Sequence, residues 1–175
     1  MSLLEEWAQW PDFAKATGKE YSFRKITTNV VLITPDLVGK FPRLWECDIF
    51  DATRENNLCR LKHEHRMLSE AYRAGICVPK PEGMFTVTIG KSELLKKLYS
   101  LTGEKLPAFV MQYVNGQKLS VFKEIPPEIN DLWQREIKKA TKLGFEPFDA
   151  MDWNAIFNPE QNKVYLIDLE YWKRK

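Results

Sequence analysis

The residues best suited to chemistry gather near the end of the sequence. The stretch FDAMDWNAIFNPEQNKVYLID places Asp149, Asp152 and Asp168 around an apolar run, with Asn154 and Asn158 as possible companions. Carboxylate and amide oxygens suit Mg²⁺, which takes few protein oxygens and completes its shell with water and phosphate. Aspartate and asparagine are also common turn residues, so turn formation is the alternative explanation of this cluster.

Asp168 directly follows VYLI, which has the pattern of a buried strand. A strand end fixes the position of a side chain while leaving it accessible, which is where catalytic groups are often displayed. Asp149 and Asn154 lie five residues apart in the preceding loop. If NPEQNK forms a hairpin turn, it brings Asp168 alongside this pair, and the three residues form a set of oxygen ligands for Mg²⁺.

Two further charged residues lie in apolar surroundings. Glu64 falls within the apolar stripe of a helix predicted from about Asn57 to Ala74, and Lys40 lies within DLVGKF, which reads as a strand. Burying an unpaired charge is costly, so the two residues are expected to pair. For either residue alone, the alternative is a place at the edge of the core, with the charged end reaching water.

Composition describes a soluble protein with one substantial core, since 44% of the 175 residues are hydrophobic. Lys and Arg (26) barely exceed Asp and Glu (24), which argues against nucleic acid or an anionic membrane as partner. Three cysteines without a CxxC spacing indicate reduced thiols in a cytoplasmic setting. Apolar runs are too short to span a membrane, and the acidic start is unlike a signal peptide.

The histidines do not form a convincing metal site. His63 and His65 lie two residues apart on a predicted helix, where their side chains face in different directions, and no third ligand is suitably spaced. We interpret both as structural or surface residues.

The elements that must position these residues can be predicted from periodicity and from turn signals. Leu3 to Phe13 predict an initial helix, and Pro127 to Gly144 predict a second long one. Residues 43–57 carry no clear period and are expected to connect elements with some local structure. Residues 90–107 are expected to form an insertion with a helical turn or two. Strands are predicted at residues 21–26, 29–34, 36–41, 83–89 and 108–114, followed by a terminal hairpin.

Taken in order, these motifs resemble the protein-kinase-like superfamily. The resemblance is greatest to its small atypical members: the RIO kinases, the small kinase of the KEOPS complex, and lipopolysaccharide-kinase-like or aminoglycoside-phosphotransferase-like proteins. It extends over roughly residues 21–172 and rests on the order and spacing of five polar positions. The resemblance implies a single α+β, bilobal domain with an antiparallel N-lobe sheet and a packed helix. Residues 1–20 would be a helical extension, 21–114 the N-lobe and 115–175 a reduced C-lobe.

The resemblance also implies which residues bind the nucleotide. DLVGKF resembles the strand that carries the phosphate-binding lysine, Lys40, and HEHRMLSEAYRAGI resembles the helix with its partner, Glu64. AFVMQYVNG resembles the strand and hinge that hold adenine. Met111 takes the gatekeeper position, and the backbone of Gln112, Tyr113 and Val114 forms the hinge.

LGFEPFDAMDWN resembles the catalytic loop, in which an Asp is followed after four residues by an Asn. It implies that Asp149 is catalytic and that Asn154 binds metal. VYLIDLE resembles the strand before the metal-binding Asp-Phe-Gly motif, which makes Asp168 the second metal ligand. ATP and Mg²⁺ are the implied cofactors.

Several positions depart from the family pattern. The segment FRKITTNVVLI has no glycine to form a phosphate-covering loop, and Pro147 and Phe148 stand where His and Arg are usual. Asp-Phe-Gly is replaced by Asp168, Leu169 and Glu170, and only five residues follow, so an activation segment is not expected.

The predicted function is therefore that of a small atypical ATP-dependent kinase, which transfers the γ-phosphate to a hydroxyl, expected to be Ser or Thr of a protein. The alternatives are a nucleotide-binding pseudokinase or scaffold, a small-molecule kinase, and a metal-dependent enzyme of another class or a plain structural domain. Retention of all five polar positions favours the kinase, because a scaffold has no physical need for them.

Overall fold

The computed structural model describes residues 22–25, 29–33, 36–42, 51–88 and 105–175. The chain divides into two compact units. The first unit comprises Met1–Lys62 and Glu82–Tyr113, and the second comprises His63–Pro81 and Val114–Lys175. Among the described residues, none of the helices combines the length and the apolar character needed to cross a membrane.

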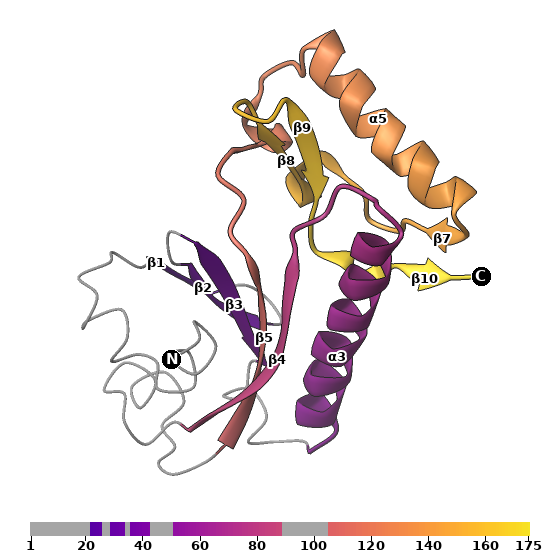
Figure 1. Cartoon of the computed structure of the whole chain (residues 1–175). Helices are drawn as coiled ribbons and strands as arrows, with labels where there is room; N and C mark the ends of the chain where they lie inside the picture. The colour runs from indigo at the N-terminus through magenta and orange to yellow at the C-terminus, as the bar shows by residue number, and fades with distance from the viewer. Residues whose placement is uncertain (1–21, 26–28, 34–35, 43–50, 89–104) are drawn as a thin grey trace. The chain divides into compact units, whose positions relative to one another are not determined.

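The first unit is built on a five-stranded sheet with the order β1-β2-β3-β5-β4 (Figure 1). Neighbours β1 and β2, β2 and β3, and β3 and β5 pair antiparallel. The sheet confirms the antiparallel architecture expected from the sequence. Its strands are β1 (Ser22–Lys25), β2 (Asn29–Ile33), β3 (Leu37–Pro42), β4 (Pro81–Thr88) and β5 (Lys105–Gln112).

Strand β5 is longer than the sequence pattern suggested. It begins at Lys105, so residues 105–107, which we assigned to an insertion, are part of the sheet. The cause is that Ala108, Phe109 and Val110 are completely buried, and this apolar centre supports extension of the strand into the residues that precede it. The helical turns predicted in the rest of the insertion, and the helix predicted at Leu3 to Phe13, lie outside the described residues.

Helix α3 spans Asp51–Arg73 and passes from the first unit into the second. The prediction that it starts near Asn57 was wrong, because the polar segment DATRENN continues the helix toward its N-terminus. This segment has no glycine or proline to stop a helix, and an aspartate at the start suits the helix dipole. The predicted end is confirmed: Gly75 adopts a left-handed φ of 78°, and the N–H of Ile76 donates to the carbonyl of Ala71.

The second unit combines the end of α3 with α5 (Pro127–Lys142) and short strands. Prolines at the start of α5 and Gly144 after its end, at φ 84°, bound this helix, which lies beside β9 (Figure 1). The predicted terminal hairpin is present as β8 (Ala155–Asn158) and β9 (Lys163–Leu166). The remaining strands are β6 (Gln117–Lys118), which pairs with β8, and β7 (Phe145–Glu146), which pairs with β10 (Lys173–Arg174).

Gly116 lies close to the backbone of β8, in the segment that follows β5. A Cβ atom added at Gly116 would lie 2.3 Å from the carbonyl oxygen of Phe157 and 2.7 Å from Cγ2 of Ile156. Because the nearest atom is backbone, the strand itself would have to move. The absence of a side chain at this position therefore allows β6 and β8 to pair.

We expect Gly116→Ala to lower the free energy of unfolding by roughly 1–3 kcal/mol, the usual cost of forcing extra volume into a packed site. Chemical denaturation would measure the change. Asn115→Ala, at the exposed neighbouring position, is the matched control and should leave stability nearly unchanged. Equal stability of the Gly116 variant and the parent would contradict the close approach.

Candidate functional site

Lys40 lies in the middle of the sheet of the first unit, on β3. Its side chain is buried, with 5% exposed. In the strand register Lys40 is opposite Phe109, and Val38 is opposite Met111. Because paired residues of an antiparallel sheet, and residues two apart on one strand, share a face, Lys40 and Met111 lie on the same face. The predicted phosphate lysine and the predicted gatekeeper are thus neighbours on one surface.

The predicted hinge begins where β5 ends. The N–H of Tyr113 donates to the carbonyl oxygen of Asp36, just before β3, at 2.8 Å. This bond fixes the backbone at the start of the hinge and occupies the Tyr113 donor. Gln112 is exposed and Val114 is buried.

Glu64 lies on the buried stripe of α3, as the sequence predicted, and is only 1% exposed. Leu61, Leu68 and Ala71 of the same stripe are completely buried. Glu64 belongs to the second unit and Lys40 to the first. The pairing of these two residues stays a prediction.

Asp149 and Asn154 meet in the loop after β7. The side-chain Nδ2 of Asn154 donates to both the carbonyl oxygen and the carboxylate Oδ2 of Asp149, each at 3.0 Å. Asn154 is 6% exposed, whereas Asp149 is exposed. Asp149 adopts a left-handed φ of 59°, which is uncommon outside glycine and points to a functional or structural constraint. The buried amide therefore holds an accessible carboxylate in a fixed position.

Asp168 is brought to this loop by the β8–β9 hairpin. Ala155 pairs with Leu166, and the N–H of Ile167 donates to the carbonyl oxygen of Asn154 at 2.9 Å. Asp168 follows immediately, also with a left-handed φ, of 60°. The structure thus joins the pair Asp149 and Asn154 to the backbone beside Asp168, as the hairpin prediction required.

The other polar residues of this region stabilise turns. Oδ1 of Asp152 accepts the N–H of Trp153 at 2.9 Å, and Oδ1 of Asn158 accepts the N–H of Gln161 at 2.8 Å. Asn158 is buried, as expected for a residue that closes the hairpin turn. Within the described part of the chain, no group of three or more His, Cys, Asp or Glu side chains could hold a metal ion.

A clamp between α3 and the last residues of the chain was not anticipated from the sequence. His63 Nε2 lies 2.7 Å from the carbonyl oxygen of Trp172, and Arg66 donates to Nδ1 of His63 at 3.1 Å. Nδ1 therefore accepts and Nε2–H donates, which assigns the neutral tautomer. This confirms a structural role for His63. The partners lie 109 residues apart in the sequence, so no local pattern could have revealed the contact.

Further contacts hold the same terminal segment. Trp172 is 1% exposed and meets the ring of Phe145 edge-on, with the ring centroids 6.2 Å apart. Arg174 pairs with Glu70 of α3 at 3.1 Å and also lies over the Phe145 ring. We call these contacts, with the His63 hydrogen bond, the terminal clamp. It ties α3, the strand before the Asp149 loop and the residues after Asp168 to one another.

Comparison with solved structures establishes the fold class as protein-kinase-like. A crystal structure of WbdD matches with a TM-score of 0.63 at 18% identity, covering 89% of this chain and 33% of that one. A structure of the bifunctional kinase-methyltransferase WbdD matches with a TM-score of 0.58 at 21% identity, covering 85% and 30%. The Rio2 kinase-ADP/Mg²⁺-phosphoaspartate complex from Chaetomium thermophilum gives a TM-score of 0.58 at 16% identity, covering 98% and 53%.

These matches confirm the fold that the sequence motifs predicted, including its likeness to the RIO kinases. The chain spans about a third of the WbdD chain and about half of the Rio2 chain. No protein-family model matches the sequence, and no curated protein matches it.

The terminal clamp can be tested through His63. His63→Leu removes the donor to the Trp172 carbonyl, and we expect it to lower the free energy of unfolding by about 1–2 kcal/mol. His63→Gln is the matched control, since its amide can donate to Trp172 and accept from Arg66. Chemical denaturation with hydrogen exchange at residues 172–175 would measure both effects. Equal loss in the two variants would contradict the hydrogen-bonding role.

Proposed function

We propose that the protein is an ATP- and Mg²⁺-dependent phosphotransferase that transfers the γ-phosphate to a hydroxyl group. The observation that carries this proposal is the pair of hydrogen bonds from Asn154 to Asp149, beside the backbone that leads to Asp168. A turn-forming cluster would need only backbone contacts of the kind made by Asp152 and Asn158. Here a buried side chain instead fixes an exposed carboxylate, which is the arrangement required of a catalytic base.

Asp149 would act on the acceptor. One carboxylate oxygen, Oδ2, accepts the Asn154 amide, so the other oxygen is the one that meets an incoming hydroxyl. Phosphoryl transfer forms a bond between the acceptor oxygen and the γ-phosphorus and breaks the bond to the leaving ADP oxygen. Asp149 orients the hydroxyl and accepts its proton.

Asn154 and Asp168 would hold the metal. With both hydrogen bonds made through Nδ2, the Asn154 Oδ1 atom is directed elsewhere and can serve as a ligand. One amide oxygen and one carboxylate fit Mg²⁺, which takes its other ligands from water and phosphate. Mg²⁺ bound there would offset the negative charge of the phosphates.

Lys40 and the hinge would bind the nucleotide. Lys40 and Met111 share one face of the sheet, so an adenine held next to Met111 would direct its phosphates toward the lysine. Glu64 is the proposed partner that keeps Lys40 charged and oriented. We assign adenine recognition to the hinge backbone from Gln112 to Val114, in which the Tyr113 N–H is bonded to Asp36.

Serine or threonine of a cytoplasmic protein is the acceptor class that we propose, with a small molecule as the alternative. A nucleotide-binding scaffold remains a second candidate, because no glycine occurs between Phe23 and Ile33 to cover the phosphates. The division into an N-lobe at 21–114 and a C-lobe at 115–175 stays a prediction. The experiments below separate kinase from scaffold.

Lys40→Ala should weaken nucleotide binding much more than it lowers the melting temperature, since the lysine would contact phosphate directly. Thermal-shift titrations with ATP, ADP and GTP, each with and without Mg²⁺, measure both quantities. Lys123→Ala removes an exposed lysine and serves as the control. An unchanged nucleotide response in the Lys40 variant would mean that Lys40 does not touch the nucleotide.

Replacing Asp168 and replacing Asp149 should affect different steps, nucleotide binding in the first case and phosphate transfer in the second. Asp168→Asn is expected to abolish Mg²⁺-dependent nucleotide stabilisation and transfer together. Asp149→Asn should keep nucleotide binding, because asparagine can still accept from Asn154, while transfer falls by roughly 10²–10⁴-fold. Transfer would be followed as autophosphorylation, ATP hydrolysis and phosphorylation of an acceptor panel.

Asp131→Asn, on the exposed face of α5, is the matched control and should change neither property. A parent protein that binds Mg·ATP without transfer to itself, to water or to any acceptor would favour the scaffold. If the Asp149 variant also matched that parent in nucleotide binding and in transfer, the kinase proposal would be wrong.

A further inference from the structure

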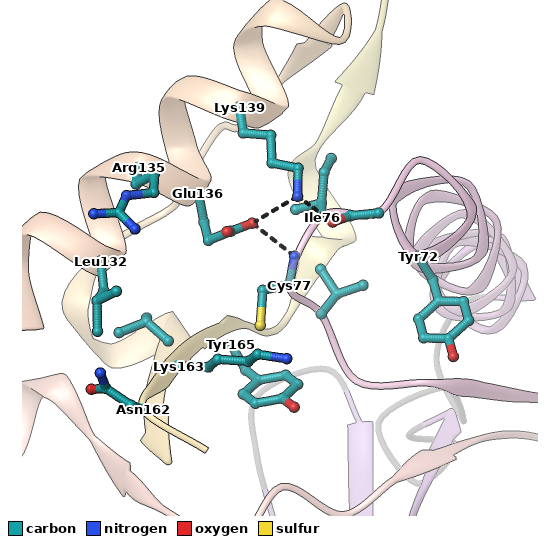
Figure 2. A pocket seen from close by; sticks show the side chains of 13 residues that line it. Tyr72, Ile76, Cys77, Leu132, Arg135, Glu136, Lys139, Asn162, Lys163 and Tyr165 are labelled. Atoms are coloured by element: carbon teal, nitrogen blue, oxygen red, sulfur yellow. Dashed lines mark hydrogen bonds and ion pairs between the residues drawn. The ribbon is translucent and has the colours of Figure 1, made fainter. Parts of the chain in front are cut away.

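A cavity of about 650 Å³ lies within the second unit, between the segment that follows α3, helix α5 and strand β9. Figure 2 shows its walls, with the Cys77 sulfur between the residues of α5 and those of β9. Its volume is in the range of small-molecule sites, roughly 300–1,000 Å³. None of Asp149, Asn154 and Asp168 lines it, so it is separate from the candidate catalytic residues.

Two charged residues of this cavity, Glu136 and Lys139, bind to groups in its own walls. Oε2 of Glu136 accepts the backbone N–H of Cys77 at 2.8 Å and lies 3.9 Å from the Lys139 ammonium (Figure 2). The same ammonium donates to the carbonyl oxygen of Gly75. Glu136 and Lys139 therefore connect α5 to the segment after α3, and their charges offset each other.

Two other cationic side chains line the cavity and, among the described residues, have no such partners. Arg135 projects from α5 and Lys163 from β9, and both are exposed. Neither side chain makes a hydrogen bond or an ion pair in the part of the chain that the structure describes. With Glu136 and Lys139 balanced, the lining carries two positive charges that are available to a ligand.

The thiol in the cavity is not available for covalent chemistry at neutral pH. Burial and, to a smaller extent, the Glu136 charge raise the pKa of Cys77 to about 11, against the opposing effect of the Lys163 and Lys139 charges. Because the thiolate is the nucleophile, a thiol with this pKa is unreactive.

Apolar side chains line the same space as the two cations. Ile76, Val78 and Val164 are almost completely buried, with 3%, 3% and 1% exposed. The partly buried Leu132 and the Tyr165 side chain add further carbon surface. A ligand in the cavity would meet carbon surface chiefly at Leu132 and Tyr165, which are the partly exposed ones. Arg135 on the α5 side and Lys163 on the β9 side would attract its negative charge (Figure 2).

We propose that this cavity binds a small organic phosphate monoester with an apolar or aromatic body. A phosphate monoester carries about −1.5 to −2 charge at neutral pH, which matches the two available cations. Arginine suits phosphate because its planar fork can donate two parallel hydrogen bonds. The inference does not depend on nucleotide binding, since the cavity and the candidate catalytic residues share no side chain.

The test uses the full chain labelled with ¹⁵N and titrated with phenyl phosphate, inorganic phosphate and phenol. Phenyl phosphate should shift amide signals of residues 72–78, 132–139 and 162–165. It should bind severalfold more tightly than either of the other probes, because only phenyl phosphate combines charge with an apolar ring. Shifts scattered over all basic residues, with inorganic phosphate as effective as phenyl phosphate, would overturn the proposal.

Charge-matched variants identify the binding groups. Arg135→Gln with Lys163→Gln should weaken phenyl phosphate binding by about tenfold, because two partly exposed ion pairs each contribute a factor of a few. Lys138→Gln with Lys142→Gln removes the same charge from α5 outside this cavity and should change affinity by less than about twofold. Equal weakening in the two double variants would show that general charge attraction causes the binding, and it would overturn the proposal.

Lys40→Ala separates this site from the proposed nucleotide site. Binding of phenyl phosphate with the expected amide shifts should persist in that variant, whatever its response to ATP. Loss of those shifts in Lys40→Ala would place the probe in the nucleotide site and overturn the inference.

Discussion

The contact between the buried amide of Asn154 and Asp149 is the constraint on which the candidate site depends. Its two hydrogen bonds hold both the backbone carbonyl and one carboxylate oxygen of Asp149. A left-handed backbone at an aspartate costs conformational energy, so the surroundings must compensate for it. Because Asn154 also accepts the Ile167 N–H through its own carbonyl, the same residue joins the loop to the strand that ends at Asp168. One residue, through its side chain and its backbone carbonyl, thereby holds both ends of this loop.

This rigidity is supported by the terminal clamp. The residues after Asp168 are anchored to the second unit: Trp172 is buried, and β10 pairs with β7, the strand that leads into the Asp149 loop. His63 and Glu70 connect this short pair of strands to α3. The helix that carries Glu64 and the loop that carries Asp149 are therefore held by neighbouring contacts within one compact unit.

The sequence predicted the structure best at positions where a charged residue stands in an apolar pattern. Glu64 inside an apolar stripe and Lys40 inside an apolar strand are both buried, as that conflict suggested. The spacing of Asp149 and Asn154 predicted that they meet, but spacing cannot give the orientation of an amide, which follows from its hydrogen-bond partners. The early start of α3 was missed because a polar segment has no apolar period, although nothing in it opposes helix formation. His63 and Trp172 lie too far apart in the sequence for any local pattern to link them.

The raised pKa of the partly buried Cys77 has a consequence for the response of this protein to oxidants. Peroxide attacks thiolates, and with a pKa of about 11 only about one Cys77 in 10⁴ is ionised at pH 7. Cys59, in contrast, is exposed on α3. Among the described residues, oxidative modification would therefore begin at Cys59 on the surface of that helix, while Cys77, beside the cavity of the second unit, reacts more slowly.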